Sequence, residues 1–517
     1  NLTFNGNYGN RIFTIASGDT IIVNGTLTFI RGIVNNGTID LNGTLVSSST
    51  FEGGSAKILI DDGQTVNISD GWVLPSINLQ NGTLNAPEGG TVTLGRLPSL
   101  TIGTNGTFNH NNGTVIFIGY ASSINVPTTV TFNNLTFNGN YGNRIFTIAS
   151  GDTIVVNGTL TLIDGYINTG TIEAKGNIVL ESTFDGGTAL INFTGTGAQT
   201  YTMTAGGVLP SGDITINKPS GSVVLSGSNT IKSSISLTDG SLEFTGGYTY
   251  TMTVGKTITA SSGTAIYFNG SSGNLVTFDS SDSVTAISMT KPDGVVVGDY
   301  VSMNRTTVSG GATWYKTVNF TGTGNTGWTD SGSGSIRTVT PTGGNWCEAT
   351  TWNEAVVPTA ADYVFATAGS GALTIDAAAV ARSVDYTGYT NTATHTAAVT
   401  LSIGDATVGA NSYALRLSSS MTYTLGSATT SAISFVSTSA TTQSITWNGK
   451  TPGNVTFDGA GATWAFEDNL SSSAYITLTR GTFKTDGTSD NLGLTHTFLG
   501  YSSDNGWTRA LNLGASN

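Results

Sequence analysis

The sequence predicts an all-β protein, a parallel β-solenoid (β-helix) that forms an elongated rod in two consecutive segments. Three observations support this prediction: a long internal repeat, short alternating runs that end at Gly-containing turns, and a deficit of charge. Charged residues make up 10% of the 517 residues, against roughly 25% in ordinary soluble domains. Hydrophobic residues reach 38%, which suffices for a core and argues against disorder. The chain is too long for one compact core.

The internal repeat is the strongest of these observations. The stretch Asn1–Ile30 returns as Asn134–Ile163, with only two of thirty positions changed: Ile22 to Val155 and Phe29 to Leu162. The match continues at an offset of 133 residues and, after a two-residue insertion, of 135. A solenoid absorbs such an insertion in a surface loop, whereas a strand in a sandwich would lose its register.

The local unit is a run of about four to six residues that ends at a tight corner. Asn-Gly pairs recur at these corners, as at Asn24-Gly25, Asn36-Gly37 and Asn157-Gly158. Asn and Gly both tolerate positive φ, so they suit either hairpin turns or solenoid corners. The short, regular spacing favours a solenoid, in which each coil pairs with the next at about 4.8 Å.

Composition changes divide the chain into three parts. We predict a β-solenoid segment at 1–329 with a repeat of about 133 residues, a Gly/Ser linker at 330–342, and a second solenoid segment at 343–517. The second segment opens with a Trp-rich stretch. We predict that Trp346, Trp352 and Pro358 in this stretch cap the coils, because an uncovered end of a solenoid exposes unpaired strands.

This opening stretch, GNWCEATTWNEAVVPTAADYVF, resembles a cap segment of large repetitive bacterial surface proteins and phage-fibre-like proteins with right-handed parallel β-helix repeats. The block at 441–470 is similar to coil motifs of the same proteins. The resemblance implies an extended architecture and an extracellular, cell-surface setting, but no single function. Residues 126–133, which precede the second copy of the repeat, have no counterpart before Asn1, so we expect the natural chain or a neighbouring subunit to continue upstream.

No catalytic cluster stands out in the sequence. The acid pairs Asp61-Asp62 and Asp279/Asp282 lie in turn-like or Ser-rich contexts, where solvated turns are the simpler interpretation. The three histidines, His110, His395 and His496, are far apart and lack metal-ligand spacing. The lone Cys347 beside Trp346 is interpreted as a small packed residue rather than a nucleophile. We therefore expect no enzyme activity, no metal site and no cofactor.

The remaining candidates for binding lie in the repeated loop NGNYGNR. It contains Tyr8 and Arg11 in the first copy and Tyr141 and Arg144 in the second. An exposed Tyr beside an Arg can stack on a sugar or hold a neighbouring subunit. A loop folded over the coil explains the two tyrosines equally well.

The predicted function is a non-catalytic, extracellular structural subunit of a cell-surface filament, sheath or adhesin that associates with itself end to end or laterally. The alternative is a carbohydrate-active or glycan-binding β-helix, either a tailspike-like lyase or hydrolase or an adhesin. The net charge of −13, with 19 Lys plus Arg, disfavours nucleic-acid binding. No apolar run of 18 residues exists, so no membrane insertion is expected.

Overall fold

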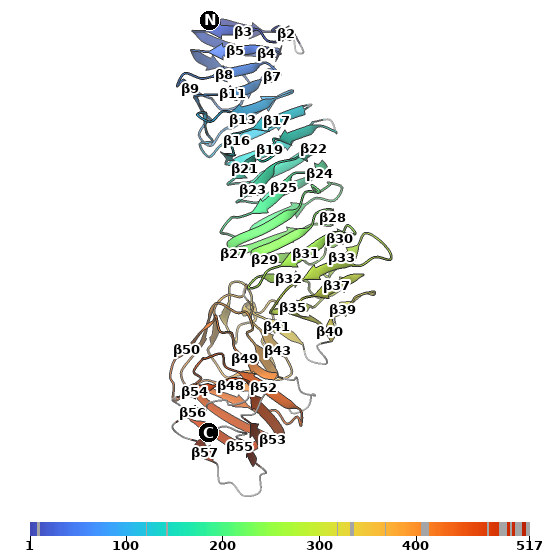
Figure 1. Ribbon diagram of the computed structural model, residues 1–517, viewed down its shortest axis with the longest axis vertical. Helices are drawn as coiled ribbons and strands as arrows, with labels where there is room; N and C mark the ends of the chain where they lie inside the picture. The colour runs from blue at the N-terminus through green and yellow to red at the C-terminus, as the bar shows by residue number, and fades with distance from the viewer. Residues whose placement is uncertain are drawn as a thin grey trace. The chain divides into compact units, whose positions relative to one another are not determined.

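The chain forms a parallel β-solenoid of about 21 turns, which confirms the predicted all-β fold class. The structure is a computed structural model (Figure 1). It describes residues 1–7, 11–119, 121–140, 143–317, 319–330, 335–367, 369–404, 413–472, 475–484, 494–496, 499–501 and 509–512. Among these residues, the regular structure is β-strand except for one short 3₁₀ helix, η1 (Ala349–Thr351).

The chain divides into two compact units. Unit 1 comprises Asn1–Thr259 with Thr277–Ser288, and unit 2 comprises Ala260–Val276 with Met289–Asn517. Within the segment 330–342, which the sequence suggested as a linker, β41 (Ile336–Thr338) pairs with β43 (Tyr363–Phe365) inside unit 2. The three-part division into independent segments and a linker stays a prediction.

Each coil of unit 1 contributes strands to three ladders. The first coil supplies β1 (Leu2–Asn5), β2 (Ile12–Thr14) and β3 (Thr20–Val23), which pair with later strands on three separate ladders. The first ladder comprises three groups of strands: β1, β4 (Thr26–Asn35) and β6 (Thr44–Val46); β9 (Thr65–Asn67), β12 (Thr83–Asn85) and β15 (Thr107–Asn109); and β18 (Thr129–Phe132), β21 (Thr153–Val156), β23 (Thr171–Ala174), β25 (Leu190–Phe193), β27 (Ile214–Ser226) and β29 (Ile235–Thr245).

The second ladder uses the second half of β4 and runs along the groove described below. Its strands are β2, β4, β7 (Phe51–Gly53), β10 (Trp72–Leu74), β13 (Thr91–Gly95), β16 (Thr114–Ile118), β19 (Asn134–Asn138), β22 (Leu160–Asn168), β24 (Ile178–Gly187), β26 (Gln199–Met203), β27 and β29.

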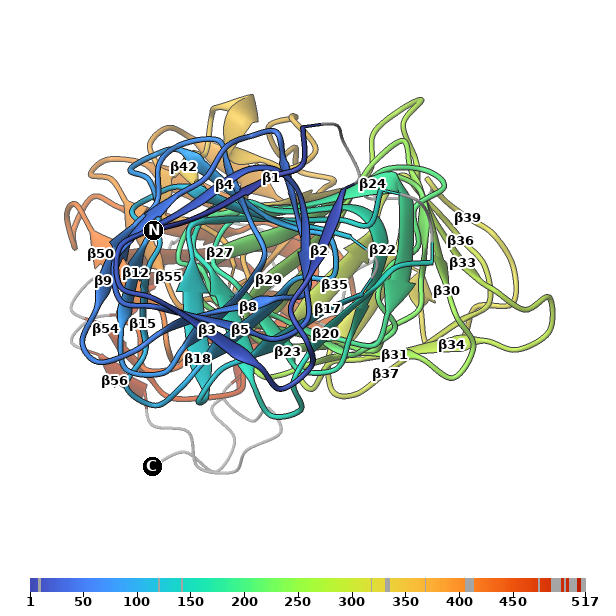
Figure 2. The ribbon, with the colours of Figure 1, turned by 90° about the horizontal axis from the view of Figure 1, so that it is seen from above.

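The third ladder is hydrogen-bonded without a break over nine coils. It runs through β3, β5 (Thr38–Leu41), β8 (Lys57–Ile60), β11 (Ser76–Leu79), β14 (Ser99–Ile102), β17 (Ala121–Asn125), β20 (Ile145–Ile148), β22 and β24. Seen from above, β9, β12 and β15 of the first ladder lie on a different side of unit 1 from β17 and β20 of the third (Figure 2). At the end of unit 1, β28 (Asn229–Ile231) pairs with β30 (Thr249–Met252), which pairs with β33 (Val276–Ser280).

The core of unit 1 contains a stack of aliphatic side chains of similar size on the third ladder, beside stacked phenylalanine rings such as Phe4, Phe29 and Phe51. Along the third ladder the inward positions pair in register and are at most 2% exposed; they are Ile39, Ile58, Ile77, Leu100, Ile124 and Ile148. Burying one such side chain stabilises the fold by about 1.5–3 kcal/mol. Because each coil offers the next an equivalent apolar surface, the stack continues coil after coil.

The Asn-Gly corners arise for two different reasons. At Asn36-Gly37 both residues have positive φ (58° and 54°), as the sequence suggested. Gly25 does not belong to the positive-φ residues; instead, a Cβ there would lie 2.3 Å from Oδ1 of Asn1. The glycine at that corner therefore makes room for the Asn1 side chain, whose Oδ1 accepts the Thr26 N–H at 2.7 Å.

The two copies of the repeat lie on different ladders. The residue offset of 133 makes β3 the counterpart of β21 and β2 the counterpart of β20. Yet β3 and β20 belong to the same continuous third ladder, whereas β21 pairs with β18 and β23 on the first. The second copy is thus rotated by one of three ladders about the coil axis, since 133 residues is not a whole number of turns.

Unit 2 repeats the coil plan with a more aromatic core. Its main sheet contains β41, β43, β46 (Ser383–Asp385), β49 (Tyr413–Arg416), β52 (Thr442–Thr446), β53 (Asn454–Phe466) and β55 (Ile476–Lys484), joined through β53 by β45 (Ala379–Ala381), β48 (Thr400–Ile403) and β51 (Ala432–Phe435). A second sheet contains β42 (Gly344–Asn345), β44 (Leu373–Ile375), β47 (Thr392–His395) and β50 (Thr422–Leu425). Trp346, Trp352, Trp447 and Trp464 are each at most 2% exposed.

A small sheet of β35 (Val295–Gly298), β38 (Thr313–Lys316) and β40 (Thr329–Asp330) lies against the main sheet of unit 2. Val295 of this small sheet shares an apolar cluster with Ile336, Tyr363 and Phe365. The remaining strands are β31 (Thr257–Ala260), β32 (Ala265–Asn269), β34 (Ile287–Thr290), β36 (Val301–Met303), β37 (Thr306–Ser309), β39 (Phe320–Thr321), β54 (Leu470–Ser472), β56 (Leu494–His496), β57 (Leu499–Tyr501) and β58 (Arg509–Asn512).

Candidate ligand-binding groove

The loop residues that the sequence singled out are only partly described. Tyr8 and Tyr141 lie outside the described residues. Arg11 is exposed and Arg144 is half-buried, and their carbonyl oxygens accept N–H bonds from Ile33 (2.8 Å) and Tyr166 (2.6 Å). The two arginines therefore hold equivalent local positions. Because the repeat is rotated, Arg11 precedes a strand of the second ladder and Arg144 a strand of the third.

The three predicted cap residues are buried in unit 2. The rings of Trp346 and Trp352 meet edge to face with centroids 5.1 Å apart, and Nε1 of Trp352 donates to the Trp346 carbonyl at 2.9 Å. Pro358 is buried as well. These contacts hold the stretch against the residue that follows β41, since Trp352 forms a β-bridge with Val339. The capping role itself stays a prediction.

Asp61, Asp62 and Asp282 occupy turns or loops, whereas Asp279 lies within β33 and not in the Ser-rich loop that the sequence suggested; its Oδ1 accepts the Ser280 N–H at 2.8 Å. Asp62 has a positive φ of 51°, and the Asp61 carbonyl accepts the Gln64 N–H at 2.8 Å. Desolvation, followed by the charges of Asp62 and Asp40, raises the pKa of Asp61. The Asp282 carboxylate accepts the Val284 N–H (2.7 Å) and the Thr285 hydroxyl (2.9 Å) within its own loop. The Asp282 carboxylate therefore stabilises its own loop, whereas the bond at Asp61 is made by the main chain.

The side chains of His395 and Cys347 in unit 2 have local partners. The ring of His395 is buried between the Tyr423 hydroxyl, 3.1 Å from Nδ1, and the Val399 carbonyl, 3.0 Å from Nε2, and burial lowers its pKa. Sγ of Cys347 donates to the Asp376 carboxylate at 2.8 Å, and this bond is the main cause of the raised pKa of Cys347. Within the described ranges, no three His, Cys, Asp or Glu residues group as metal ligands.

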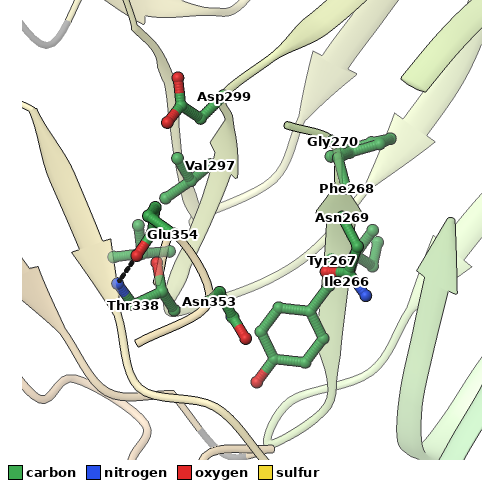
Figure 3. Close-up of a pocket in the computed structure, with 11 residues that line it drawn as sticks. Ile266, Tyr267, Phe268, Asn269, Gly270, Val297, Asp299, Thr338, Asn353 and Glu354 are labelled. Atoms are coloured by element: carbon green, nitrogen blue, oxygen red, sulfur yellow. Dashed lines mark hydrogen bonds between the residues drawn. The ribbon is translucent and has the colours of Figure 1, made fainter. Parts of the chain in front are cut away.

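Unit 2 contains a small cavity of about 40 Å³ with two acids on its wall (Figure 3). Oε2 of Glu354 accepts the Thr338 N–H at 2.9 Å, and burial raises the pKa of Glu354 to about 7. Asp299 accepts hydrogen bonds from the Thr317 hydroxyl (2.5 Å) and the Asn319 amide (3.0 Å), and its carboxylate points away from that of Glu354. A cavity of this size holds water-sized groups and not a sugar ring.

A larger groove of about 500 Å³ lies along the second ladder of unit 1. Its volume falls within the range of small-molecule sites. The residues that line it come from the four strands β7, β10, β13 and β16 and from the turns after β13, β16 and β19: Phe51, Glu52, Val73, Thr93, Gly95, Arg96, Ile118, Gly119, Gly139 and Asn140. The strand pairings place Val73 opposite Thr93, and Gly95 opposite Ile118.

An ion pair lies on the wall of the groove. Nη1 of Arg96 lies 3.5 Å from Oε2 of Glu52, and each side chain is about one-third exposed (33% and 31%). Arg96 and the following Leu97 both have positive φ (51° and 55°), a conformation that costs about 1 kcal/mol or more per residue. Arg96 N donates to the Ile118 carbonyl at 2.7 Å, which fixes this turn against the next coil.

The groove is built from both copies of the repeat. Phe51 and Glu52 belong to the first copy, whereas Gly139 and Asn140 belong to the NGNYGNR loop of the second. In the second copy the counterpart of Glu52 is Asp185, whose carboxylate accepts the Asn143 N–H at 3.0 Å from the same loop. Sequence reasoning missed Glu52 and Arg96, because nothing local shows that residues 44 positions apart meet.

Comparison of the chain with models of protein families, with curated proteins and with solved structures found no match. The described residues contain no helix with the length and apolar character that crossing a bilayer requires.

Proposed function

We propose that the protein is a non-catalytic structural subunit of an extracellular filament, sheath or adhesin. The observation that carries this proposal is the third ladder, which is hydrogen-bonded without a break from β3 to β24. Successive coils stabilise one another as nearest neighbours, so such a stack suits a load-bearing or spacing role. The resemblance of the cap-like stretch to repetitive surface proteins supports the extracellular setting.

Polar ladders on the surface of unit 1 support the same role. Side-chain amides hydrogen-bond from coil to coil: Asn85 Nδ2 donates to Asn67 Oδ1, and Asn109 Nδ2 donates to Asn85 Oδ1, each at 2.7 Å. Each such bond contributes about 1 kcal/mol and does not depend on charge. A surface held by amide and hydroxyl ladders, in a chain with only 10% charged residues, loses little stability when salt or pH changes.

Electron microscopy of the purified chain over a range of concentrations tests the self-association. We expect filaments or laterally ordered arrays that lengthen or widen as the concentration rises. Uniform, monodisperse particles at every concentration would contradict self-assembly. Incubation with a panel of polysaccharides tests the non-catalytic part, and released oligosaccharides would contradict it.

The groove of unit 1 favours a second candidate function, passive binding of glycans by an adhesin. The groove has the volume of a ligand site and combines apolar and hydrogen-bonding side chains. This candidate is compatible with the structural role, because a filament can also carry binding sites along its length.

A further inference from the structure

We propose that the groove of unit 1 binds a linear, uncharged oligosaccharide that lies along the direction in which the coils stack, held by Glu52 and Arg96. The proposal rests on the glycan-binding candidate and not on the structural role. It assigns the site to residues of the groove rather than to the tyrosines of the repeated loop.

The shape of the groove suits an extended chain. Three steps of the second ladder separate β10 from β19, which at the usual strand spacing gives a length of about 14 Å. The volume of about 500 Å³ is spread along these steps. A linear polymer that crosses the strands would meet a new set of side chains at each coil.

The chemistry of the lining matches a sugar ring. Val73 and Ile118 offer apolar surface for the C–H face of the ring, and Thr93 and Asn140 offer hydroxyl and amide groups. Glu52 supplies carboxylate acceptors and Arg96 supplies guanidinium donors, which bind hydroxyl groups more strongly than neutral partners do. The ion pair keeps both side chains at the groove before any ligand arrives, which reduces the ordering cost of binding.

The charge balance selects an uncharged ligand. Glu52 and Arg96 are the charged residues among those that line the groove, and their charges cancel. An acidic polysaccharide would require an excess of cationic side chains, as a phosphate polymer does. The groove therefore discriminates against uronic acids and sulfated sugars.

An extended peptide is a poorer occupant. Peptides that bind to sheets usually add a strand at a free edge. In the groove, β13 is paired on both sides, with β10 and β16, and β16 is paired with β13 and β19. Their backbone groups are already used, so a peptide would have to bind through side chains alone.

The test is isothermal titration calorimetry of the full chain with hexasaccharides. The neutral probes are the hexamers of β-1,4-glucose, β-1,4-xylose, β-1,4-N-acetylglucosamine and α-1,4-glucose, and the acidic probe is the hexamer of galacturonic acid. We expect at least one neutral hexamer to bind, and the acidic hexamer to bind at least tenfold more weakly. No binding of any neutral hexamer at millimolar concentration, or preferred binding of the acidic one, would overturn the proposal.

Variants then locate the site. Arg96→Ala and Glu52→Gln should each weaken binding of the neutral hexamer at least tenfold. Thr93→Trp fills the groove from an outward, half-buried position and should abolish binding without removing a charge. The matched control is Lys175→Ala, which breaks the ion pair with Glu173, also 3.5 Å apart in unit 1 but outside the groove. It should leave binding unchanged.

Two further measurements separate failure of the proposal from other failures. Circular dichroism and thermal unfolding of each variant should match the parent chain, so that lost binding reflects the groove. Electron microscopy of Thr93→Trp should show the same assemblies as the parent, since the structural role does not use the groove. Unchanged affinity in a folded Thr93→Trp variant would refute the assignment, whatever the microscopy shows.

Discussion

The two copies of the repeat have almost the same sequence and local geometry, yet they differ in what surrounds them. Thr26 N donates to Oδ1 of Asn1 at 2.7 Å, and Thr159 N donates to Oδ1 of Asn134 at 2.8 Å. Gly6 N donates to the Arg31 carbonyl and Gly139 N to the Asp164 carbonyl, both at 2.9 Å. The described residues of the two near-identical stretches therefore form equivalent strands on two different ladders.

The neighbours decide the exposure of the same positions. Ile22 is 61% exposed, and its described pairing is with Asp40; Val155, its counterpart, is 5% exposed and lies between Thr131 and Glu173. Asp152 is 9% exposed and accepts the Val126 N–H from an earlier coil at 2.7 Å. The local sequence thus determines the backbone conformation of a coil, whereas the stacking of coils determines how much each residue contributes to the free energy of unfolding.

The largest expected effect tests the shared geometry. A Cβ at Gly43 would lie 1.9 Å from the Gly25 carbonyl oxygen, and a Cβ at Gly176 would lie 2.0 Å from that of Gly158. Because the coil spacing cannot widen locally, Gly43→Val and Gly176→Val should each lower the free energy of unfolding by about 4 kcal/mol or more. Urea unfolding followed by circular dichroism measures this. The control is Gly197→Ala. A Cβ at Gly197 meets open space, so this substitution should change the free energy of unfolding by less than about 0.5 kcal/mol.

The second prediction concerns a corner where the copies diverge. Gln64 Nε2 donates to the Gly43 carbonyl (3.2 Å) and Gln199 Nε2 to the Gly176 carbonyl (2.6 Å), but only the second corner contains the buried Lys218. Nζ of Lys218 has three acceptors, which are Gly195 O (2.5 Å), Gly197 O (2.8 Å) and Gln199 Oε1 (2.6 Å). Lys218→Met leaves these acceptors unpaired and should cost about 3 kcal/mol.

The same lysine gives a pH dependence of known sign. Burial lowers the pKa of Lys218 from 10.5 to about 8, so between these values the unfolded chain binds more protons than the folded one. The free energy of unfolding of the parent should therefore rise with pH across this window, and the Lys218→Met variant should lack that rise. Asp61→Ala, at the corresponding corner of the first copy, should change stability by less than about 0.5 kcal/mol. Equal losses at the two corners would contradict the distinction.

The third prediction compares two aspartates of identical local sequence. Asp152→Ala removes the acceptor of the buried Val126 N–H and should cost about 2 kcal/mol. Asp19 is exposed, so Asp19→Ala should cost less than about 0.5 kcal/mol. Hydrogen exchange checks the mechanism. In Asp152→Ala the protection of the Val126 amide should fall by more than the loss of global stability explains, whereas other amides should follow the global loss. Equal losses of unfolding free energy in Asp152→Ala and Asp19→Ala would show that the neighbouring coil does not determine how much each aspartate contributes.

The smallest expected effect uses one of the two natural differences between the copies. Val155→Ile adds a methylene at a buried position and should cost about 1 kcal/mol through overpacking. Ile22→Val, at the exposed counterpart, should change stability by less than about 0.5 kcal/mol. Thermal unfolding of the two variants measures both. If Val155→Ile stabilises the chain, the position has space that the present packing does not show.

The sequence predicted the class of fold because solenoid periodicity is a local property. Short alternating runs and Gly-containing corners specify one coil at a time, and the Asn36-Gly37 corner has the positive φ angles that its residues favour. The chain absorbs the two-residue insertion between the offsets 133 and 135. Gln64 bonds to Gly43 and Gln199 to Gly176, and these equivalent bonds each join a residue before the insertion point to one after it. The Trp346–Trp352 pair is likewise visible in sequence as an unusual local density of aromatic residues.

The rotation of the second copy by one ladder came only from the tertiary structure. A repeat offset in residues becomes an angle only when divided by the length of a turn, and the coils vary in length through their corners, as the spacings along the third ladder show. That angle places the loop of the second copy, at Gly139 and Asn140, on the same groove as Glu52 of the first copy. By itself, the sequence determined the strands and corners of each coil. The tertiary structure decided which residues of different coils meet, because those contacts depend on the total number of residues in the coils between them.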